Sequence, residues 1–249
     1  MKVIPVHTGF KALRTIAQAV KPMIAIVCCM QMQPVSAQTK ILDVEQGEKD
    51  AGRFGQNLKH FVHIYMGGGF IAGASEPGAP LKYTSSGSGL YGIRYKMKIS
   101  NAYAWGYEIF YNATSYGLKQ DSTKIIPYVI LHDKESYNTG ALGLMLYNRF
   151  NFYGVRGNAI GYYMDIGISG EWNIRRNTFS KDKLPGGLII ETTTRKIPYI
   201  NPLASHVILR VGYQHVSFTG AYRITNFFFS SYHYPQMPKL ILGLEIGIF

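Results

Sequence analysis

The chain has 249 residues, a formal net charge of +12 and only 16% charged residues, with 27 glycines and 19 tyrosines. So much glycine disfavours helices, whereas tyrosine favours strands and interfaces. No stretch after residue 37 reaches the roughly eighteen consecutive apolar residues that a spanning helix needs, which argues against a helical membrane protein. The length suits one domain of the all-β kind or two smaller ones.

The N-terminus has the pattern of an export signal. Four basic residues and no acid precede an apolar run at 23–30, and Val35-Ser36-Ala37 fits a signal-peptidase site. We therefore predict that residues 1–37 are a cleaved signal peptide; an uncleaved anchor is the alternative, but the apolar run is too short to span. Cleavage lowers the net charge from +12 to +8 and removes both cysteines, so no disulfide framework is expected.

Export also limits the partners. A charge of +8 on an exported chain indicates anionic lipid head groups or lipopolysaccharide rather than nucleic acid. Residues 38–57 are polar and mixed in charge, which predicts a flexible lead-in, with a plug in the lumen as the lesser alternative. Residues 58–249 then form the folded domain.

Alternating apolar and polar residues predict the strands in chain order. The first covers 61–66 and continues toward Ile71 through Gly67-Gly68-Gly69, which we interpret as a bulge rather than a phosphate-binding loop because no helix pattern follows. After a loop at 75–89, strands at 91–99 and 103–112 form a hairpin around Ser100-Asn101.

The remaining segments repeat this pattern. Further strands are predicted at 139–150, 162–172, 206–214, 218–224 and 240–249. The long connections at 117–138 and 175–205 are each expected to contain strand extensions, at 125–131 and 188–194 respectively. A short link through Gly154 and Gly157 precedes the strand at 162–172, and a long connection at 225–239 precedes the last strand.

Eight strands joined by alternating long and short connections indicate an all-β, eight-stranded antiparallel up-and-down transmembrane β-barrel, with the long connections at one end. The polar face carries many glycines and charges of both signs, as a narrow lumen requires. The predicted lumen charge network consists of Arg94, Lys96, Glu108, Arg149, Asp165, Glu171, Arg210, Arg223 and Glu245. The predicted aromatic girdle at the membrane interface consists of Tyr103, Trp105, Tyr162, Tyr213 and Phe218.

The export signal, the eight segments, the cysteine-free mature chain and the terminal Phe249 together resemble small Gram-negative outer-membrane barrels. Tyr234-Pro235-Gln236-Met237-Pro238 followed by 242–247 is similar to the end of the outer membrane protein β-barrel domain family, which includes PorT-like proteins of the type IX secretion system. The resemblance covers residues 59 onward and implies that Phe249 is a signal for the barrel-assembly machinery. Phe249 nevertheless shares its parity with Glu245 and Gly247, whereas the family signal is in phase with apolar residues.

Candidate chemistry is sparse. Ser205-His206 could serve a lipid-A-modifying enzyme, but neighbouring strand residues point to opposite faces, so a strand start fits better. Asp165 and Glu171 lie about 20 Å apart along one strand, and His233 has no ligand-spaced partner. Residues 227–229 are either a partner-binding patch or a loop folded over its own rim. No catalytic residue, cofactor or metal is expected.

The sequence therefore predicts a non-enzymatic outer-membrane barrel, structural or part of a secretion or envelope assembly, with long loops as contact surfaces. There are two alternatives. One is a lipid-A-modifying enzyme. The other is a soluble periplasmic barrel of the lipocalin kind, whose strands show the same alternation but with the apolar face inside and the polar face outside.

Overall fold

The computed structural model describes residues 53–152 and 159–248. The strands are β1 (His60–Ala72), β2 (Gly87–Lys98), β3 (Tyr103–Leu118), β4 (Lys134–Phe152), β5 (Tyr162–Lys183), β6 (Ile189–Arg195), β7 (Leu203–Tyr213), β8 (Val216–Arg223) and β9 (Leu240–Ile248). Two short 3-10 helices, η1 (Tyr83–Ser85) and η2 (Ser230–Tyr232), lie in long connections. Within the described ranges, no helix has the length and apolar character to cross a membrane.

Several sequence predictions fall outside these ranges. They are the signal peptide at 1–37, the lead-in up to residue 52, the link glycines Gly154 and Gly157, and Phe249.

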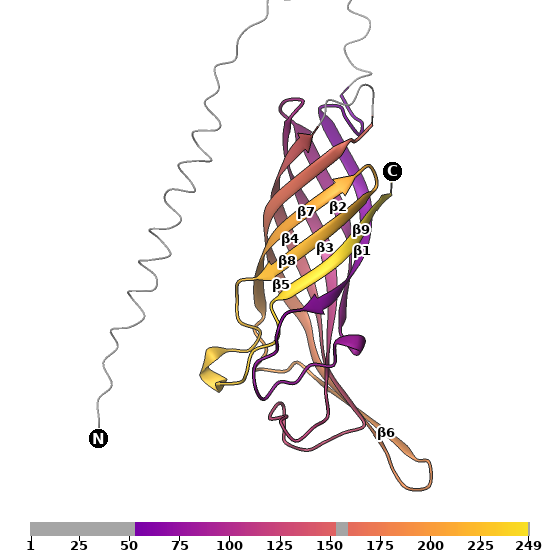
Figure 1. Ribbon diagram of the computed structural model, residues 1–249, viewed down its shortest axis with the longest axis vertical. Helices are drawn as coiled ribbons and strands as arrows, with labels where there is room; N and C mark the ends of the chain where they lie inside the picture. The colour runs from indigo at the N-terminus through magenta and orange to yellow at the C-terminus, as the bar shows by residue number, and fades with distance from the viewer. Residues whose placement is uncertain (1–52, 153–158, 249) are drawn as a thin grey trace, which may run out of the picture. The chain divides into compact units, whose positions relative to one another are not determined.

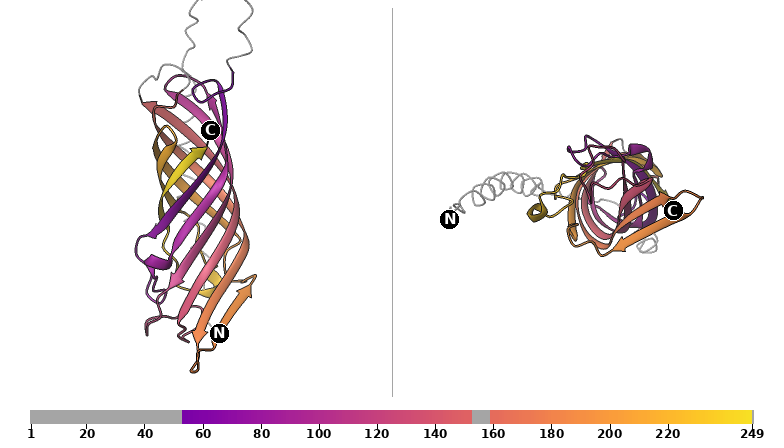
Figure 2. Two further views of the ribbon diagram at one scale, coloured as in Figure 1. Left: turned by 90° about the vertical axis from the view of Figure 1, so that its right-hand side faces the viewer. Right: turned by 90° about the horizontal axis from the view of Figure 1, so that it is seen from below.

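Eight of the strands close into a barrel, as predicted. The hydrogen-bonded order is β4-β3-β2-β1-β9-β8-β7-β5-β6, and β4 also pairs with β5, which completes the ring. All neighbouring strands are antiparallel. The view along the barrel in Figure 2 shows the closed ring. The extra strand, β6, pairs only with β5 among the described strands and takes no part in closure.

The predicted pairing of the last strand with the first is confirmed. Ile64 lies opposite Ile248, and the register continues without interruption to Ala72 opposite Leu240. The glycines in β1 therefore do not form the predicted bulge. They permit close approach instead, because a Cβ on Gly67 or Gly69 would lie 2.8 or 2.9 Å from a backbone oxygen of β9.

Long and short connections alternate around the ring. The long ones (73–86, 119–133, 184–202 and 224–239) gather at one end of the barrel, here called the long-connection end (Figure 1). The links 99–102 and 214–215 lie at the opposite, short-connection end, where β4 ends at Phe152 and β5 begins at Tyr162. An up-and-down barrel requires this arrangement, because every second turn returns to the same rim.

β4 and β5 are longer than predicted. They pair from Phe152 opposite Tyr162 to Lys134 opposite Lys181, with one bulge where Gly140 faces Arg175 and Ala141 faces Asn173. The strand predicted at 188–194 is present as β6 and pairs with the far half of β5. Together these segments extend the sheet beyond the barrel (Figure 1).

The strand extension predicted at 125–131 is wrong, since these residues form no strand. Two anchors hold them as a loop instead: the Lys124 ammonium donates to the carbonyl oxygen of Ile130, and Ile126 is fully buried. Only Ile126 of these apolar residues is buried, whereas Ile125 and the four residues 128–131 are exposed, so the apolar run reflects neither pairing in a sheet nor burial as a whole.

Candidate functional site

The centre of the barrel holds a closed network of ion pairs between inward-facing side chains. Its members are Arg94 of β2, Glu108 of β3, Arg149 of β4, Asp165 of β5, Arg210 of β7 and Glu245 of β9. All six side chains are buried, and their three positive and three negative formal charges balance. Burial of such charges is tolerable only because each one has a partner.

The arginines link the acids into one unit. Arg94 lies 2.6 Å from both Glu108 and Glu245. Arg210 reaches Glu108 at 2.9 Å and Asp165 at 3.0 Å through the same Nη1 atom. The Arg210 Nε lies 2.9 Å from Glu245 Oε2, in an ion pair without the alignment of a hydrogen bond.

The two barrel strands without a charge in the network contribute other contacts. From β1, the Tyr65 ring lies 4.1 Å from the guanidinium carbon of Arg94, a cation–π contact. From β8, the Thr219 hydroxyl donates to Glu245 Oε1 at 2.9 Å. Every strand of the ring therefore contacts the network, which spans the lumen from wall to wall at this level.

Small residues make room for this filling. A Cβ on Gly106 would lie 2.0 Å from the Tyr95 carbonyl oxygen and 2.6 Å from the Tyr147 ring, so the Tyr147 side chain occupies that space. Next to the network is a cavity of about 60 Å³, lined by Phe110, Ile208 and His206 among others. This volume accommodates a few water molecules but no larger ligand.

Three predicted members of the lumen network lie at other levels of the barrel. The Lys96 ammonium donates to the Gln56 carbonyl oxygen. Glu171 accepts from Asn112 at 3.1 Å and lies 2.9 Å from His206 Nδ1, so its partner is a histidine rather than an arginine. Arg223 donates to the Tyr116 hydroxyl at 2.8 Å and to the Met237 carbonyl oxygen at 2.9 Å.

The last residues of the predicted lead-in contact the short-connection end of the barrel. Besides the Lys96 contact with Gln56, the Lys98 ammonium donates to the carbonyl and side-chain oxygens of Asn57, both at 3.0 Å. The backbone N–H of Gly55 donates to the His60 carbonyl oxygen at 2.8 Å. Residues 53–57 are thus attached to β1 and β2.

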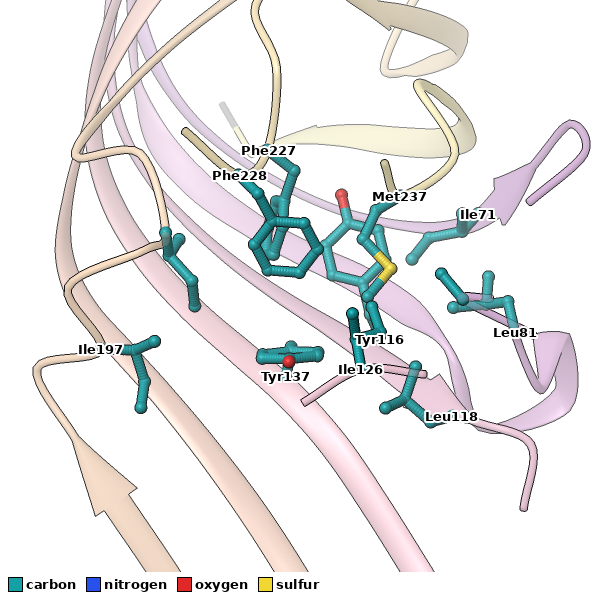
Figure 3. Packing of buried hydrophobic residues seen from close by; sticks show 12 residues of the cluster. Ile71, Leu81, Tyr116, Leu118, Ile126, Tyr137, Ile197, Phe227, Phe228 and Met237 are labelled. Carbon is teal, nitrogen blue, oxygen red and sulfur yellow. The ribbon is translucent and has the colours of Figure 1, made fainter. Parts of the chain in front are cut away.

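The long connections fold over the opposite rim and form an apolar cap, which Figure 3 shows. The cap consists of Ile71, Ala79, Leu81, Tyr116, Leu118, Ile126, Tyr137, Ile197, Ile200, Phe227, Phe228 and Met237. Gln236 fixes one of its loops, because its Oε1 accepts from the backbone N–H groups of Phe227 and Phe228 at 2.8 and 3.1 Å.

The cap decides between the two interpretations of the phenylalanine run. Phe227 and Phe228 are buried within it, as a loop folded over its own rim requires, whereas Phe229 keeps 37% of its surface exposed. Beside the cap, the buried Lys124 ammonium pairs with Glu135. Nothing in the sequence period indicated this pair, because Lys124 lies in a loop.

The outward face is apolar on every barrel strand. Among the predicted girdle residues, Trp105, Tyr162, Tyr213 and Phe218 are exposed on this face near the short connections. Tyr162 and Tyr213 pack with ring centroids 4.5 Å apart. Tyr103 is half-buried and donates to Asn148 Oδ1 at 2.6 Å.

The candidate catalytic residues do not form a nucleophile and base pair. His206 points into the barrel toward Glu171, while Ser205 follows the opposite parity of β7. Asp165 and Glu171 have separate partners, Arg149 and His206. Within 53–152 and 159–248 there is no group of three or more His, Cys, Asp or Glu side chains arranged for a metal ion.

No protein-family model matches this chain, and no curated protein matches it. What it shares with small outer-membrane barrels is the eight-stranded antiparallel barrel fold.

Proposed function

We propose that this protein is a non-enzymatic integral β-barrel of a Gram-negative outer membrane, exported by a cleaved signal peptide, with its long loops as contact surfaces. One observation carries the proposal: an apolar belt surrounds the barrel on its outside, while the network of six paired charges lies inside. Each barrel strand contributes one of the residues Ile64, Ile93, Ile109, Leu144, Ile168, Leu209, Phe218 and Ile246, all 48–58% exposed.

Such a belt is costly in water. Burial of apolar surface contributes about 25 cal/mol per Å², and soluble monomers rarely expose apolar patches above a few hundred Å². A ring of isoleucine, leucine and phenylalanine around all eight strands therefore requires an apolar surrounding. The hydrocarbon core of a bilayer provides it, and the aromatic residues near the short connections fit its interface with water.

A soluble ligand-binding barrel of the lipocalin kind fits less well. It needs an apolar cavity inside and a polar surface outside, which is the reverse of the arrangement described above. The ion network and the cavity of about 60 Å³ beside it leave no room for a lipid-sized ligand at that level. The same filling argues against a general pore.

A lipid-A-modifying enzyme also fits less well. Its substrate would approach from the bilayer, on the outside of the barrel, whereas His206 is buried inside and contacts Glu171. Replacement of His206 tests this alternative, because it would abolish activity toward lipid A if His206 were catalytic. We expect that neither the parent protein nor a His206 variant modifies lipid A.

With a filled lumen and a capped end, the accessible parts are the loops and the extended β4–β5–β6 sheet. We therefore place the role of the protein in contacts with lipopolysaccharide and with envelope or secretion-system proteins. Insertion would depend on the barrel-assembly machinery.

Membrane fractionation combined with electrophoresis tests this proposal. We expect the protein in the outer-membrane fraction, with an apparent mass that changes when the sample is boiled, since the closed barrel resists detergent until heated. Recovery in the soluble periplasmic fraction without a heat-dependent shift would contradict it.

A further inference from the structure

The β5–β6 hairpin has an exposed tip and an exposed second strand, since residues 183–196 are all exposed. β5 pairs with β7 only as far as Trp172, opposite Leu203, and it pairs with β6 from Asn177 to Lys183. The hairpin thus leaves the barrel wall and projects past the long-connection end (Figure 1). β6 ends the strand order of the sheet, so one of its two edges has no strand beside it within the described residues.

The backbone groups at this free edge can be identified from the ladder. Next to the hairpin tip, Leu184 N donates to the Leu188 carbonyl oxygen at 2.8 Å. In an antiparallel pair the hydrogen-bonded positions recur at every second residue, so Ile190, Thr192 and Thr194 also bond to β5. The residues between them direct their N–H and C=O groups to the free edge: Ile189, Glu191, Thr193 and Arg195.

This edge lacks the usual protection. All seven residues of β6 are exposed, none is proline, and five of the seven are isoleucine or threonine, which favour extended backbone. Natural proteins normally block such an edge with proline, a bulge or a covering loop, because it is a template for pairing with another chain. An open edge of this kind suits the addition of an extended peptide strand.

Charge limits what can pair there. Residues 175–196 contain six basic and two acidic side chains, a net charge of +4. Both acids are already engaged, since Glu191 pairs with Lys181 at 2.7 Å and Asp182 lies 2.8 Å from His132 Nδ1. A second copy of the hairpin would bring two like-charged surfaces together, which disfavours self-pairing. An anionic lipid matches the charge but has no backbone to continue the ladder.

We infer that the free edge of β6 binds an extended, acidic segment of another protein by β-strand addition. The backbone of that segment pairs with Ile189, Glu191, Thr193 and Arg195, and its acidic side chains lie among the basic residues of the hairpin. Its apolar side chains contact Leu188 and Ile190, which are 61% and 45% exposed near the tip. This inference holds for a barrel in either a membrane or water.

Thr193 allows a matched pair of variants. Thr193→Pro removes the N–H that faces the free edge but none of the bonds to β5, and proline is tolerated on a strand edge that faces solvent. Thr193→Val keeps that N–H and the β-branched shape. The probes are two labelled peptides, one that alternates glutamate with valine and one that alternates lysine with valine. Fluorescence anisotropy with the folded protein measures their affinities.

We expect the glutamate peptide to bind the parent protein and the Thr193→Val variant equally, and the Thr193→Pro variant at least roughly tenfold more weakly. We expect the lysine peptide not to bind. Absence of glutamate-peptide binding, equal binding of both peptides, or affinity unchanged by Thr193→Pro would each overturn the inference. So would sedimentation showing a dimer of the parent protein that Thr193→Pro dissociates, because the edge would then be occupied by a second copy.

Discussion

Arg149 and Asp165 form a two-point ion pair across β4 and β5. Nε lies 2.7 Å from Oδ1 and Nη2 lies 2.8 Å from Oδ2, with side-chain exposures of 1% and 0%. The two residues are register partners, so the alignment of the two strands places them opposite each other. Asp165 also accepts from Arg210 at 3.0 Å, which makes it a junction between neighbouring parts of the network.

We predict that Asp165→Leu destabilises the barrel by about 3–5 kcal/mol, because it leaves the buried Arg149 without an acid and Arg210 with one fewer. The double variant Arg149→Met with Asp165→Leu should recover most of the loss, since it removes the unpaired charge as well. Urea unfolding of the refolded protein measures both. If Asp165→Leu alone were as stable as the double variant, leaving Arg149 without its acid would cost no stability, which would contradict the prediction.

We predict that Gly106→Ala lowers stability by about 1–3 kcal/mol through overpacking. A Cβ there would lie 2.0 Å from a backbone oxygen of β2, which cannot move without breaking the ladder, and 2.6 Å from Tyr147. The same urea titration measures the loss.

Gly170→Ala is the matched control, because a Cβ at this position in β5 meets nothing within 4 Å. Its stability should stay within about 0.5 kcal/mol of the parent. If both variants lost stability equally, the cause would be the backbone rather than the packing of Tyr147.

The barrel could be predicted from sequence because two signals agree. Along strands such as β2 and β3, one face meets the interior and the other does not, so apolar and polar residues alternate. Connection length then assigns each turn to a rim. The closure of β9 on β1 followed from the last strand, which could not remain an open edge.

The extension of β4 and β5 beyond the barrel could not be predicted in the same way. Where β5 leaves the ring, neither of its faces meets a uniform surrounding, and residues 178–182 are all of intermediate exposure. The period of two therefore disappears even though the pairing continues. The bulge opposite Gly140 also shifts the phase of β5 by one residue.

The lumen network was predicted as a set of inward charges, but its connections were not. Six of the nine residues meet because the tilt of the strands brings them to one level, and the sequence contains no information on that stagger. Lys96, Glu171 and Arg223 have the correct parity but lie at other levels. Tyr65 and Thr219 were missed because an uncharged inward residue gives no signal of an ionic contact.

If the belt faces lipid, Ile109→Arg should lower the stability of the inserted barrel by about 2–4 kcal/mol, because Ile109 lies midway along β3 and is 58% exposed. Ile99→Arg, equally exposed but located in a short link, should cost at most about 1 kcal/mol. Refolding into lipid vesicles at increasing urea measures both. In a barrel that faces water, both changes would be neutral, and that outcome would contradict the proposed location.

Phe228 is the fully buried centre of the cap, and its ring lies 4.8–5.8 Å from those of Phe227, Tyr137, Tyr199 and Tyr234. Phe228→Ala opens a cavity among these rings, which typically costs about 3–5 kcal/mol. Because the cap consists mainly of loops, we expect this loss to open the connection 224–239 and leave the eight-stranded ring intact. Limited proteolysis should then cleave that connection faster, while the heat-dependent electrophoretic shift persists.

Phe229→Ala is the matched control in the same run, since 37% of the Phe229 side chain is exposed and its removal leaves no enclosed cavity. We expect its cleavage rate to stay close to that of the parent. Faster cleavage in both variants would mean that the connection 224–239 does not depend on the burial of Phe228 in particular. Loss of the heat-dependent shift in Phe228→Ala would mean instead that the cap and the barrel fold as one cooperative unit.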